Sequence, residues 1–183
     1  MSQQTFNKAK ISDAIEDIKK GIPIIVVDNE NRENEGDLVL AAEMSNLENI
    51  AFCMRYARGL MCIPCEGKRL DKLNIPMMVE STEDPLETPF TISVDAKKTN
   101  SGMSVYDRLK TINVLVDDNS LPNDLQRPGH MFPLRPRDGL LKERQGHTES
   151  SIELMKLAGL KQISIIVEII NDDGTMAKGD ELE

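Results

Sequence analysis

Short apolar runs rich in β-branched residues alternate irregularly with segments of helical spacing, and this alternation limits the chain to mixed folds. Strands are predicted at residues 22–27, which should be buried, and at 38–42, 60–63, 90–94 and 163–170. Helices are predicted at residues 11–18, 46–58, 70–73, 107–116 and 148–158. Residues 117–137 are rich in Asp, Asn, Pro and Gly, which predicts a long functional loop. The sequence therefore predicts an α+β fold, one mixed domain around a layered sheet.

The length and composition fit a single globular domain. The chain has 183 residues, of which 39% are hydrophobic and 29% are charged, so it can bury a real core. No apolar stretch approaches the roughly 20 residues of a membrane span. Residues 1–4 have neither the basic nor the apolar region of a secretory signal. We therefore expect one domain over residues 1–183, located in the cytoplasm, with no membrane partner.

The net charge of −9 opposes a general affinity for nucleic acid. Aromatic residues make up 3% of the chain and Trp is absent, which leaves almost nothing for bases to stack on. We therefore expect no nucleic-acid partner. An acidic protein that handles an anionic substrate must collect its cations locally. One stretch of this chain is rich in cations and is therefore predicted to bind a phosphate group. Its cations are Arg127, Arg135, Arg137, Lys142 and Arg144.

The three cysteines are an odd number and form no disulfide framework, which suits a reducing compartment. Cys62 and Cys65 have C-x-x-C spacing, but a zinc site requires about four ligands, and only Cys53 and two histidines remain. A structural zinc site is therefore disfavoured.

An acidic loop with the sequence Arg-Glu-Asn-Glu-Gly-Asp covers residues 32–37, just after a predicted strand. Glu33, Glu35 and Asp37 stand on alternate positions, so they share one face if the backbone is extended. Carboxylates as close to one another as these require a cation between them. Mg²⁺ or Mn²⁺ is the usual cation in an oxygen-rich cytosolic site. A solvated acidic turn is the alternative, and Arg32 either neutralises the acids or binds a substrate.

A second motif, Arg-Gln-Gly-His-Thr-Glu at residues 144–149, opens a predicted helix. Gly146 allows a ligand to approach the backbone, and Thr148, as the predicted N-cap, offers a hydroxyl beside the free amides of the first turn. His147 is placed to face the same point. Arg144 favours an anion at this helix N-terminus over the alternative, a capped helix start with an exposed histidine.

Two further residues are candidates for proton transfer. His130 lies in the Pro/Gly-rich segment 127–133, and imidazole is the natural proton shuttle near neutral pH. The alternative is a loop histidine without a task. Glu168 stands inside the apolar run 165–169, so it either faces solvent at a sheet edge or is buried with a partner. Burial would raise the pKa of this carboxyl toward a value suited to acid–base work.

Five motifs occur together in an order that identifies a family. They are the acidic loop at 32–37, Gly-Leu-Met-Cys at 59–62, Arg-Pro-Gly-His-x-Phe-Pro-Leu-Arg at 127–135, Arg-x-Gly-His-Thr-Glu at 144–149, and Glu-Ile-x-Asn-Asp-Asp-Gly-Thr-Met-Ala at 168–177. With these motifs, the chain resembles 3,4-dihydroxy-2-butanone 4-phosphate synthase of riboflavin biosynthesis over most of its length.

The resemblance implies a lyase that converts D-ribulose 5-phosphate into 3,4-dihydroxy-2-butanone 4-phosphate and formate. It implies Mg²⁺, with Mn²⁺ as a substitute, and a homodimer with active sites at the subunit interface. It also implies that family's single-domain layered α/β sandwich around a mixed β-sheet. The metal ligands would be Glu33 and His147. The catalytic residues would be Asp37, Cys62, His130 and Glu168. Substrate contacts would come from Arg32, Glu33, Asp37, Arg144, Gln145, Gly146, His147, Thr148 and Glu168.

The chain departs from the family pattern at two places. Where the family usually has Thr-Thr-Gly, this chain has Asn100-Ser101-Gly102, which keeps a hydroxyl and loses a methyl, so activity is expected to persist. The family generally continues beyond the position of Glu183, so the domain would lack the usual C-terminal tail, which bears on stability. Two rival functions stay open: a non-catalytic sugar-phosphate binding module, and another metal-assisted sugar-phosphate enzyme such as an isomerase or aldolase. Neither rival releases formate.

Overall fold

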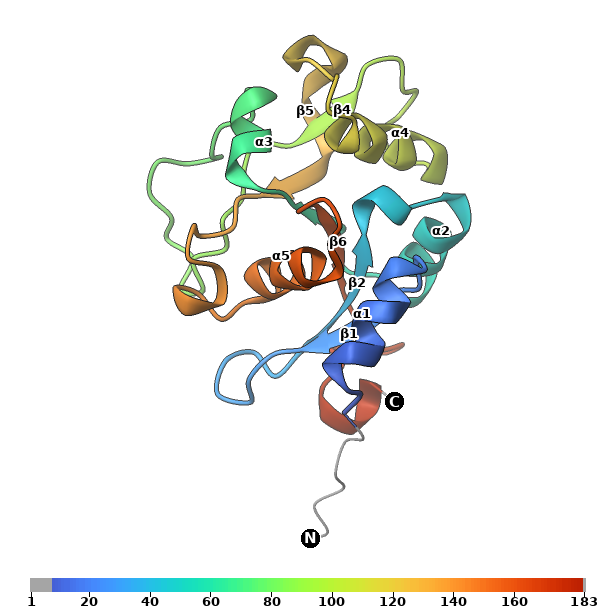
Figure 1. The fold of residues 1–183 in the computed structure, drawn as a ribbon, viewed down its shortest axis with the longest axis vertical. Coiled ribbons are helices and arrows are strands. Elements are labelled where there is room, and N and C mark those ends of the chain that lie inside the picture. The colour runs from blue at the N-terminus through green and yellow to red at the C-terminus, as the bar shows by residue number, and fades with distance from the viewer. Residues whose placement is uncertain (1–7, 183) are drawn as a thin grey trace, which may run out of the picture.

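The computed structural model describes residues 8–182, which form one mixed β-sheet with helices on both faces (Figure 1). In this part of the chain the strands are β1 (Ile24–Val27), β2 (Gly36–Ala41), β3 (Cys62–Pro64), β4 (Val94–Ala96), β5 (Leu125–Leu134) and β6 (Ser164–Glu168). Their order across the sheet is β1-β2-β6-β3-β5-β4. β3 and β5 are parallel, while the other neighbouring strands are antiparallel. The predicted α+β fold around a mixed sheet is therefore confirmed.

The helices form two outer layers. They are α1 (Ile11–Lys19), α2 (Leu47–Tyr56), α3 (Gly67–Lys72), α4 (Val105–Val116) and α5 (His147–Ala158), with short 3-10 helices at Ala42–Met44, Pro122–Asp124, Leu140–Lys142 and Gly179–Leu182. On one face, Ile18 of α1 and Met155 of α5 belong to a core cluster with Val39 of β2. On the other face, Ile50 of α2 belongs to a cluster with Leu40 of β2, which also takes in α3 and α4. The sheet is thus the middle of three layers.

Side-chain alternation along the strands sends two carboxylates to the α5 face. Leu38 and Leu40 of β2 belong to the core under α2 and α4, whereas Val39 faces α1 and α5. Asp37 has the same parity as Val39, so its side chain lies on the α5 side as well. Antiparallel pairing of β2 with β6 places Asp37 opposite Glu168. Two acids therefore meet on the sheet near the N-terminus of α5.

Several predicted elements are confirmed with small changes at their ends. The helix predicted at 11–18 is α1, and the helix predicted at 46–58 is α2. Asn46 is the N-cap of α2, where its side chain accepts hydrogen bonds from the N–H groups of Glu48 and Asn49. The helix predicted to end at Ala158 is α5, with Gly159 as its C-cap.

The long loop predicted at residues 117–137 is wrong, because this segment contains the ten-residue strand β5. Two of its residues, Pro128 and Gly129, lie where the pairing of β5 with β4 is irregular. Val94 pairs with Met131 but Asp95 pairs with Gln126, so the ladder is irregular between these two pairs. Pro128 lies in that irregular stretch, where a missing N–H breaks no ladder hydrogen bond. Composition indicated a loop where the chain forms a bulged strand.

Two strand predictions need correction. Residues 22–27 are predicted to be buried, but β1 is an edge strand, and its Ile25 and Val27 are exposed. Residues 90–94 are predicted to form a strand, but β4 starts only at Val94, and Phe90 and Thr91 make isolated bridges. In both cases the β-branched and aromatic composition indicates extended backbone without indicating its position in a sheet.

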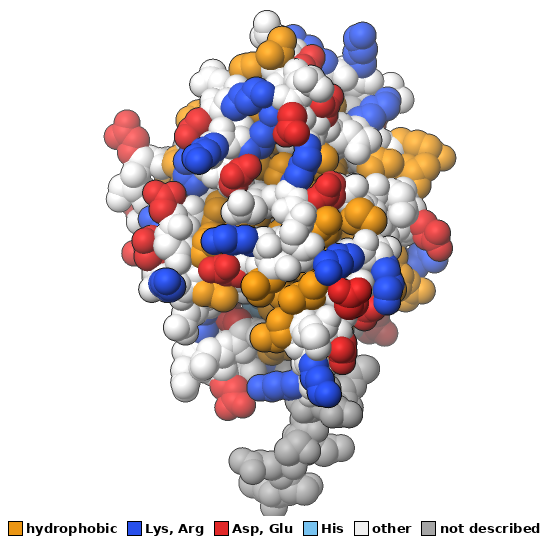
Figure 2. All heavy atoms as spheres, viewed as in Figure 1, with side chains coloured by type: hydrophobic (Ala, Val, Ile, Leu, Met, Phe, Trp, Pro, Cys, Tyr) orange, Lys and Arg blue, Asp and Glu red, His pale blue; other side chains and the backbone are white. Residues whose placement is uncertain are grey.

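The surface in Figure 2 carries Lys and Arg side chains interspersed with Asp and Glu. Charges of both signs therefore alternate over this face instead of forming one field of a single sign. Within residues 8–182, no helix combines the length and the apolar character needed to cross a membrane.

Candidate active site

A cavity of about 210 Å³ opens between the N-terminus of α5 and the strands β2, β6 and β3. Eight of the eleven predicted site residues line it, namely Arg32, Glu33, Asp37, Cys62, Arg144, His147, Thr148 and Glu168. The lining also includes Thr88 and Phe90, which sequence analysis placed in no site. The cavity thus brings together motifs that are more than 100 residues apart in the chain.

Asp37 and Glu168 form a pair of carboxyl groups in this lining. Asp37 is 3% exposed, and its Oδ1 atom has no hydrogen-bond partner in the described part of the chain. Burial, followed by the charge of Glu168, raises the pKa of Asp37 well above its usual value. Burial also raises the pKa of Glu168. Both carboxyls can hold a proton at a higher pH than a free carboxyl, as acid–base chemistry near neutral pH requires.

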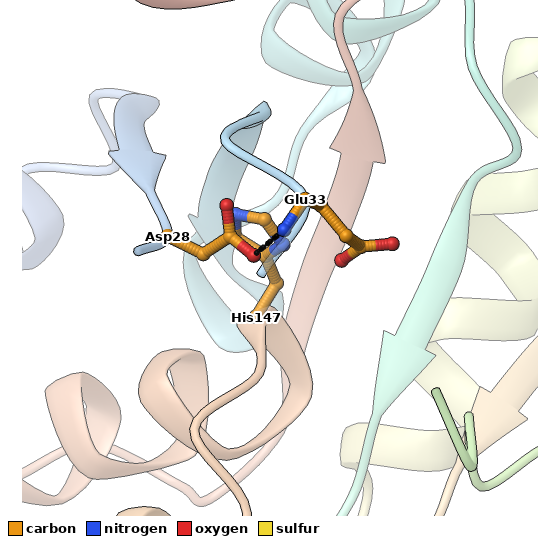
Figure 3. Close-up of side chains that lie close together, drawn as sticks. All are labelled: Asp28, Glu33 and His147. Atoms are coloured by element: carbon orange, nitrogen blue, oxygen red, sulfur yellow. Dashed lines mark hydrogen bonds between the residues drawn. The ribbon is translucent and has the colours of Figure 1, made fainter. Parts of the chain in front are cut away.

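Three side chains form a group that can hold a metal ion. Asp28 follows β1, Glu33 lies in the turn after it, and His147 begins α5 (Figure 3). One ligand atom from each lies within 4.8 Å of the others. The Nε2 atom of His147 is buried without a hydrogen-bond partner, and burial lowers the pKa of this imidazole. A neutral imidazole with a free lone pair beside carboxylates fits a divalent cation.

Asp28, which sequence analysis missed, organises the acidic loop. Its Oδ2 atom accepts hydrogen bonds from Arg32 at 2.7 Å and from the N–H of Glu33 at 3.2 Å, and its Oδ1 atom accepts from the N–H of Glu35 at 3.0 Å. Burial alone would raise the pKa of Asp28, but these hydrogen bonds lower it. The one sequence signal for this role is an Asp directly after a strand, where its side chain accepts N–H groups of the following turn.

The acidic loop is not extended throughout, because Glu33 lies in a turn, but Glu33, Glu35 and Asp37 nevertheless all line the cavity. Asp37 is part of β2, while Glu33 lies in the turn and Glu35 pairs with Lys178 at 3.4 Å. Arg32 pairs with Asp28 and Glu33 and also lines the cavity. Both roles considered for Arg32 therefore fit its position.

The N-terminus of α5 is built to face an anion. Gly146 is the N-cap, and no side chain caps the helix, so the first backbone N–H groups have no intrahelical partner. A Cβ atom at Gly146 would meet the guanidinium of Arg144 and lie 3.2 Å from that of Arg32. Both cations therefore converge on this helix end. Thr148 is the second residue of α5 and not its N-cap, which corrects the prediction, but it still lines the cavity.

Arg144 is held in place by two further contacts. It donates to the fully buried carboxylate of Glu149 at 2.6 Å and to the carbonyl of Leu86 at 3.1 Å. The other arginines of the predicted phosphate-binding stretch make their contacts outside the cavity. Arg127 donates to the Leu73 carbonyl, Arg135 pairs with Asp71, and Arg137 pairs with Glu87. Of the five predicted cations, Arg144 alone lines the cavity.

Cys62 of β3 lines the cavity between the carboxyl pair and the core. Burial, followed by the charges of Glu168 and Asp37, raises the pKa of its thiol. The thiol is therefore protonated at neutral pH, which suits contact with a substrate better than nucleophilic attack. Cys65 belongs to the core cluster on the opposite face of the sheet, so the C-x-x-C pair does not converge.

Three predicted site residues do not line the cavity. Gln145 and Gly146 lie in the turn that leads into α5. His130 lies in β5, with its side chain 49% exposed and its Nδ1 atom 2.7 Å from Oδ2 of Asp95. Within one chain, His130 therefore does not line the cavity that contains Asp37.

The fold and the cavity define an α+β protein in which a carboxyl pair, a group that can hold a divalent cation and a helix N-terminus that can hold an anion line one space. This is the equipment of an enzyme that acts on a small phosphorylated compound. The family model described as 3,4-dihydroxy-2-butanone 4-phosphate synthase matches residues 12–183, and the chain belongs to this family.

Individual relatives agree with this assignment. A 3,4-dihydroxy-2-butanone 4-phosphate synthase of Agrobacterium fabrum is 49% identical over 176 residues, which cover 96% of this chain and 83% of that protein. The Monofunctional riboflavin biosynthesis protein RIBA 2, chloroplastic, of Arabidopsis thaliana is 46% identical over 97% of this chain, which spans 38% of that protein's length. A crystal structure of a 3,4-dihydroxy-2-butanone 4-phosphate synthase in complex with two magnesium ions has a TM-score of 0.91 and 38% identity, covering 95% of this chain and 87% of that one. The resemblance inferred from the sequence is confirmed.

Proposed function

We propose that this chain converts D-ribulose 5-phosphate into 3,4-dihydroxy-2-butanone 4-phosphate and formate, as a lyase that depends on a divalent metal. The observation that carries the proposal is the carboxyl pair of buried Asp37 and partly buried Glu168, which lines one cavity with the metal-binding group at His147 and the N-terminus of α5. Membership in the family selects this reaction among those that such a site supports.

The carboxyl pair supplies the proton transfers. The two products together contain every atom of the substrate, so the reaction requires a carbon rearrangement and proton movements but no oxidant and no second substrate. Because their pKa values are raised, Asp37 and Glu168 can accept a carbon-bound proton and deliver a proton to a departing hydroxyl. The thiol of Cys62 lines the same cavity, and because it is neutral it brings no charge to the cavity.

Glu33 and His147 would hold Mg²⁺, and the same ligands also suit Mn²⁺. The unpartnered Nε2 atom of His147 and the nearby carboxylates support this assignment. The relative that binds two magnesium ions supports it as well. When bound, the ion polarises the carbonyl and hydroxyl oxygens of the substrate. Asp28 faces the same group, and three hydrogen bonds from the acidic loop fix the position of its carboxylate.

The substrate phosphate would bind at the N-terminus of α5. Arg144 and Arg32 converge there, Thr148 offers a hydroxyl, and the free N–H groups of the first turn face the same space. Gln145 and Gly146 would contribute their backbone. Binding energy from a phosphate that takes no part in the chemistry then holds the reacting carbons against Asp37.

A second copy of the chain would complete the site, which makes the protein a homodimer with active sites at the subunit interface. His130 supports this arrangement, because it is exposed and lies outside the cavity of its own chain. Exposed apolar side chains support it too. Leu60 at the cavity and the aromatic rings of Phe52, Tyr56 and Tyr106 on α2 and α4 are all more than 40% exposed. Large exposed apolar groups of this kind are typical of a surface that another protein covers.

Three further expectations stay predictions. They are the single domain over residues 1–183, the cytoplasmic location and the absence of a nucleic-acid or membrane partner. The plant relative is described as chloroplastic, so the compartment differs among relatives.

The test is release of formate from D-ribulose 5-phosphate by the purified protein, with Mg²⁺ and with excess chelator. We expect formate only when metal is present. The Asp37→Asn variant should release none under either condition. Binding of the sugar phosphate without any turnover would support a binding module. Consumption of the substrate without formate would support an isomerase or an aldolase.

A further inference from the structure

We propose that Asp95 is a positioning residue that fixes the imidazole of His130 as the Nδ1–H tautomer and leaves Nε2 available for proton transfer. The inference rests on the proposed function for the role of His130 in turnover, but the pairing itself is a property of the folded chain. Asp95 lies in β4 and belongs to none of the five sequence motifs.

Both oxygens of Asp95 are directed at the same residue. Oδ1 accepts a hydrogen bond from the backbone N–H of His130 at 2.9 Å, and Oδ2 lies 2.7 Å from Nδ1 of the imidazole. A carboxylate only accepts hydrogen bonds, so the proton between Oδ2 and Nδ1 belongs to the imidazole. A neutral imidazole that carries its proton on Nδ1 has its lone pair on Nε2.

The two partners differ sharply in burial, so one side of the pair faces the protein interior and the other faces solvent. Asp95 is 1% exposed, whereas the side chain of His130 is 49% exposed. The exposed part of the ring is therefore the side away from Asp95, which carries Nε2. Arg108, which is 9% exposed, is the nearby cation, but it donates to the Met103 carbonyl at 3.0 Å and not to Asp95. In the described part of the chain, the side-chain hydrogen bonds of Asp95 go to His130 alone.

The chain around the pair leaves room for it. Gly102 has a φ of 76°, and a Cβ atom there would collide with Oδ2 of Asp95 and lie 2.5 Å from Nδ1 of His130. The loop before α4 therefore covers the hydrogen bond closely and protects it from water. A protected hydrogen bond to a buried carboxylate is stronger than one exposed to solvent, which favours one fixed ring orientation.

A purely structural role for Asp95 is the competing explanation, because β4 and β5 lose their regular pairing between Val94 and Asp95. Bridging that irregularity needs only the bond from Oδ1 to the His130 N–H. The second bond, from Oδ2 to the ring, adds nothing to the backbone but determines which ring nitrogen carries the proton. The tautomer of His130 therefore separates the two explanations.

The first test is the tautomer of His130 by ¹⁵N and ¹³C NMR of protein labelled at histidine. The chain has two histidines, so the His147→Gln variant assigns the signals. We expect the Nδ1–H form in the wild type at a pH where the ring is neutral. Asp95→Asn should shift the population toward Nε2–H, because the amide N–H₂ group of Asn can donate to Nδ1. The matched control is Asp107→Asn, a buried acid that makes no hydrogen bond to His130 and should leave its tautomer unchanged. An Nε2–H ring in the wild type, or the same tautomer in Asp95→Asn, would overturn the proposal.

The second test is turnover, measured as formate release. Asp95→Asn should lower kcat about tenfold or more, up to the ~10² to 10⁴ that acid–base catalysis contributes, with little change in KM. In the His130→Gln background, Asp95→Asn should have no further effect, and Asp95→Glu should recover part of the loss. Independent effects of the two variants on kcat would contradict a role through His130. A wild type that releases no formate would overturn the proposed function and leave the tautomer result standing.

Discussion

Asp37 lies directly opposite Glu168 in the antiparallel pair of β2 and β6, and both side chains line the same cavity. Two acids held together away from water lower the free energy of unfolding, because their charged forms lose solvation and repel each other. Such a pair contributes nothing to the core. A pair of this kind is typical of a site for proton transfer or for a bound cation, and it makes the stability of the metal-free protein depend on pH.

Glu168→Gln should stabilise the metal-free protein at alkaline pH. Burial raises the pKa of Glu168 in the folded state, so between the unfolded and folded pKa values the folded protein binds more protons, and its stability falls as the pH rises through this interval. Gln does not titrate and escapes this loss. We expect a higher Tm for the variant near pH 8 and no gain near pH 3, where the carboxyl is protonated in both states.

Thermal unfolding in the presence of chelator measures this effect. Glu80→Gln is the matched control, because Glu80 is an exposed loop residue and its substitution removes the same formal charge. A Tm for Glu168→Gln at or below that of the control at alkaline pH would contradict the burial argument. Turnover of Glu168→Gln should be lost in either case.

Metal affinity should distinguish the two histidines. His147→Gln should weaken Mn²⁺ binding by roughly tenfold or more, because it removes a buried, unpartnered nitrogen from the group with Glu33. His130→Gln is the matched control and should bind Mn²⁺ as the wild type does, since His130 lies outside the cavity of its chain. Titration followed by electron paramagnetic resonance of Mn²⁺ measures both affinities without turnover. Equal affinities for the two variants would remove His147 from the metal site.

The sequence predicts most accurately those helices that combine a clear apolar periodicity with residues that mark the helix ends. The helix that starts after Asn46 and the one that ends before Gly159 have such signals and were found within a few residues. β5 was missed because Pro128 is typical of a loop in the sequence, while in space it lies at an irregularity of a strand pair. Sequence gives local backbone preference, and strand pairing depends on partners far along the chain.

The candidate site was predicted in large part because its chemistry lies in compact motifs, and the family resemblance linked those motifs. Residues whose task depends on a distant partner gave no such signal. Asp28 is one Asp among many until the loop folds around its carboxylate. Asp95 is an ordinary strand residue until His130, 35 positions later, pairs with it. Local spacing cannot indicate such contacts, because they form only with the tertiary structure.

Arg144→Lys should raise the KM for D-ribulose 5-phosphate about tenfold or more, as expected for loss of a charge-assisted hydrogen bond worth ~1.5–3 kcal/mol. Lys keeps a cation beside the buried carboxylate of Glu149, which would otherwise be left unpaired. Arg137→Lys is the matched control. Arg137 pairs with the exposed side chain of Glu87 and does not line the cavity, so its KM should not change. Steady-state formate release measures both variants, and equal KM values would exclude Arg144 as the phosphate contact.

The cysteines should react slowly with iodoacetamide at neutral pH as long as the protein is folded. All three are buried, and burial raises the pKa of the Cys53 thiol to about 11 and that of Cys62 further. Alkylation requires the thiolate, which is scarce under these conditions. Mass spectrometry over time should show little modification in buffer and complete modification in denaturant. Rapid, selective alkylation of Cys62 in the folded protein would instead identify it as an activated nucleophile.

Two inactive variants should restore each other's activity if the site is shared between subunits. Glu33→Gln damages the cavity and His130→Gln damages the group that a partner would supply. In a mixed dimer of the two, one site carries both defects and the other carries none. Equal amounts refolded together give mixed dimers in half of the molecules, so about a quarter of the wild-type activity should return. Glu33→Gln refolded with His147→Gln is the matched control, because both defects lie in the same cavity and no mixed dimer contains an intact site. Recovery confined to the first mixture would establish that His130 acts across the interface, whereas no recovery in either would assign each site to one chain.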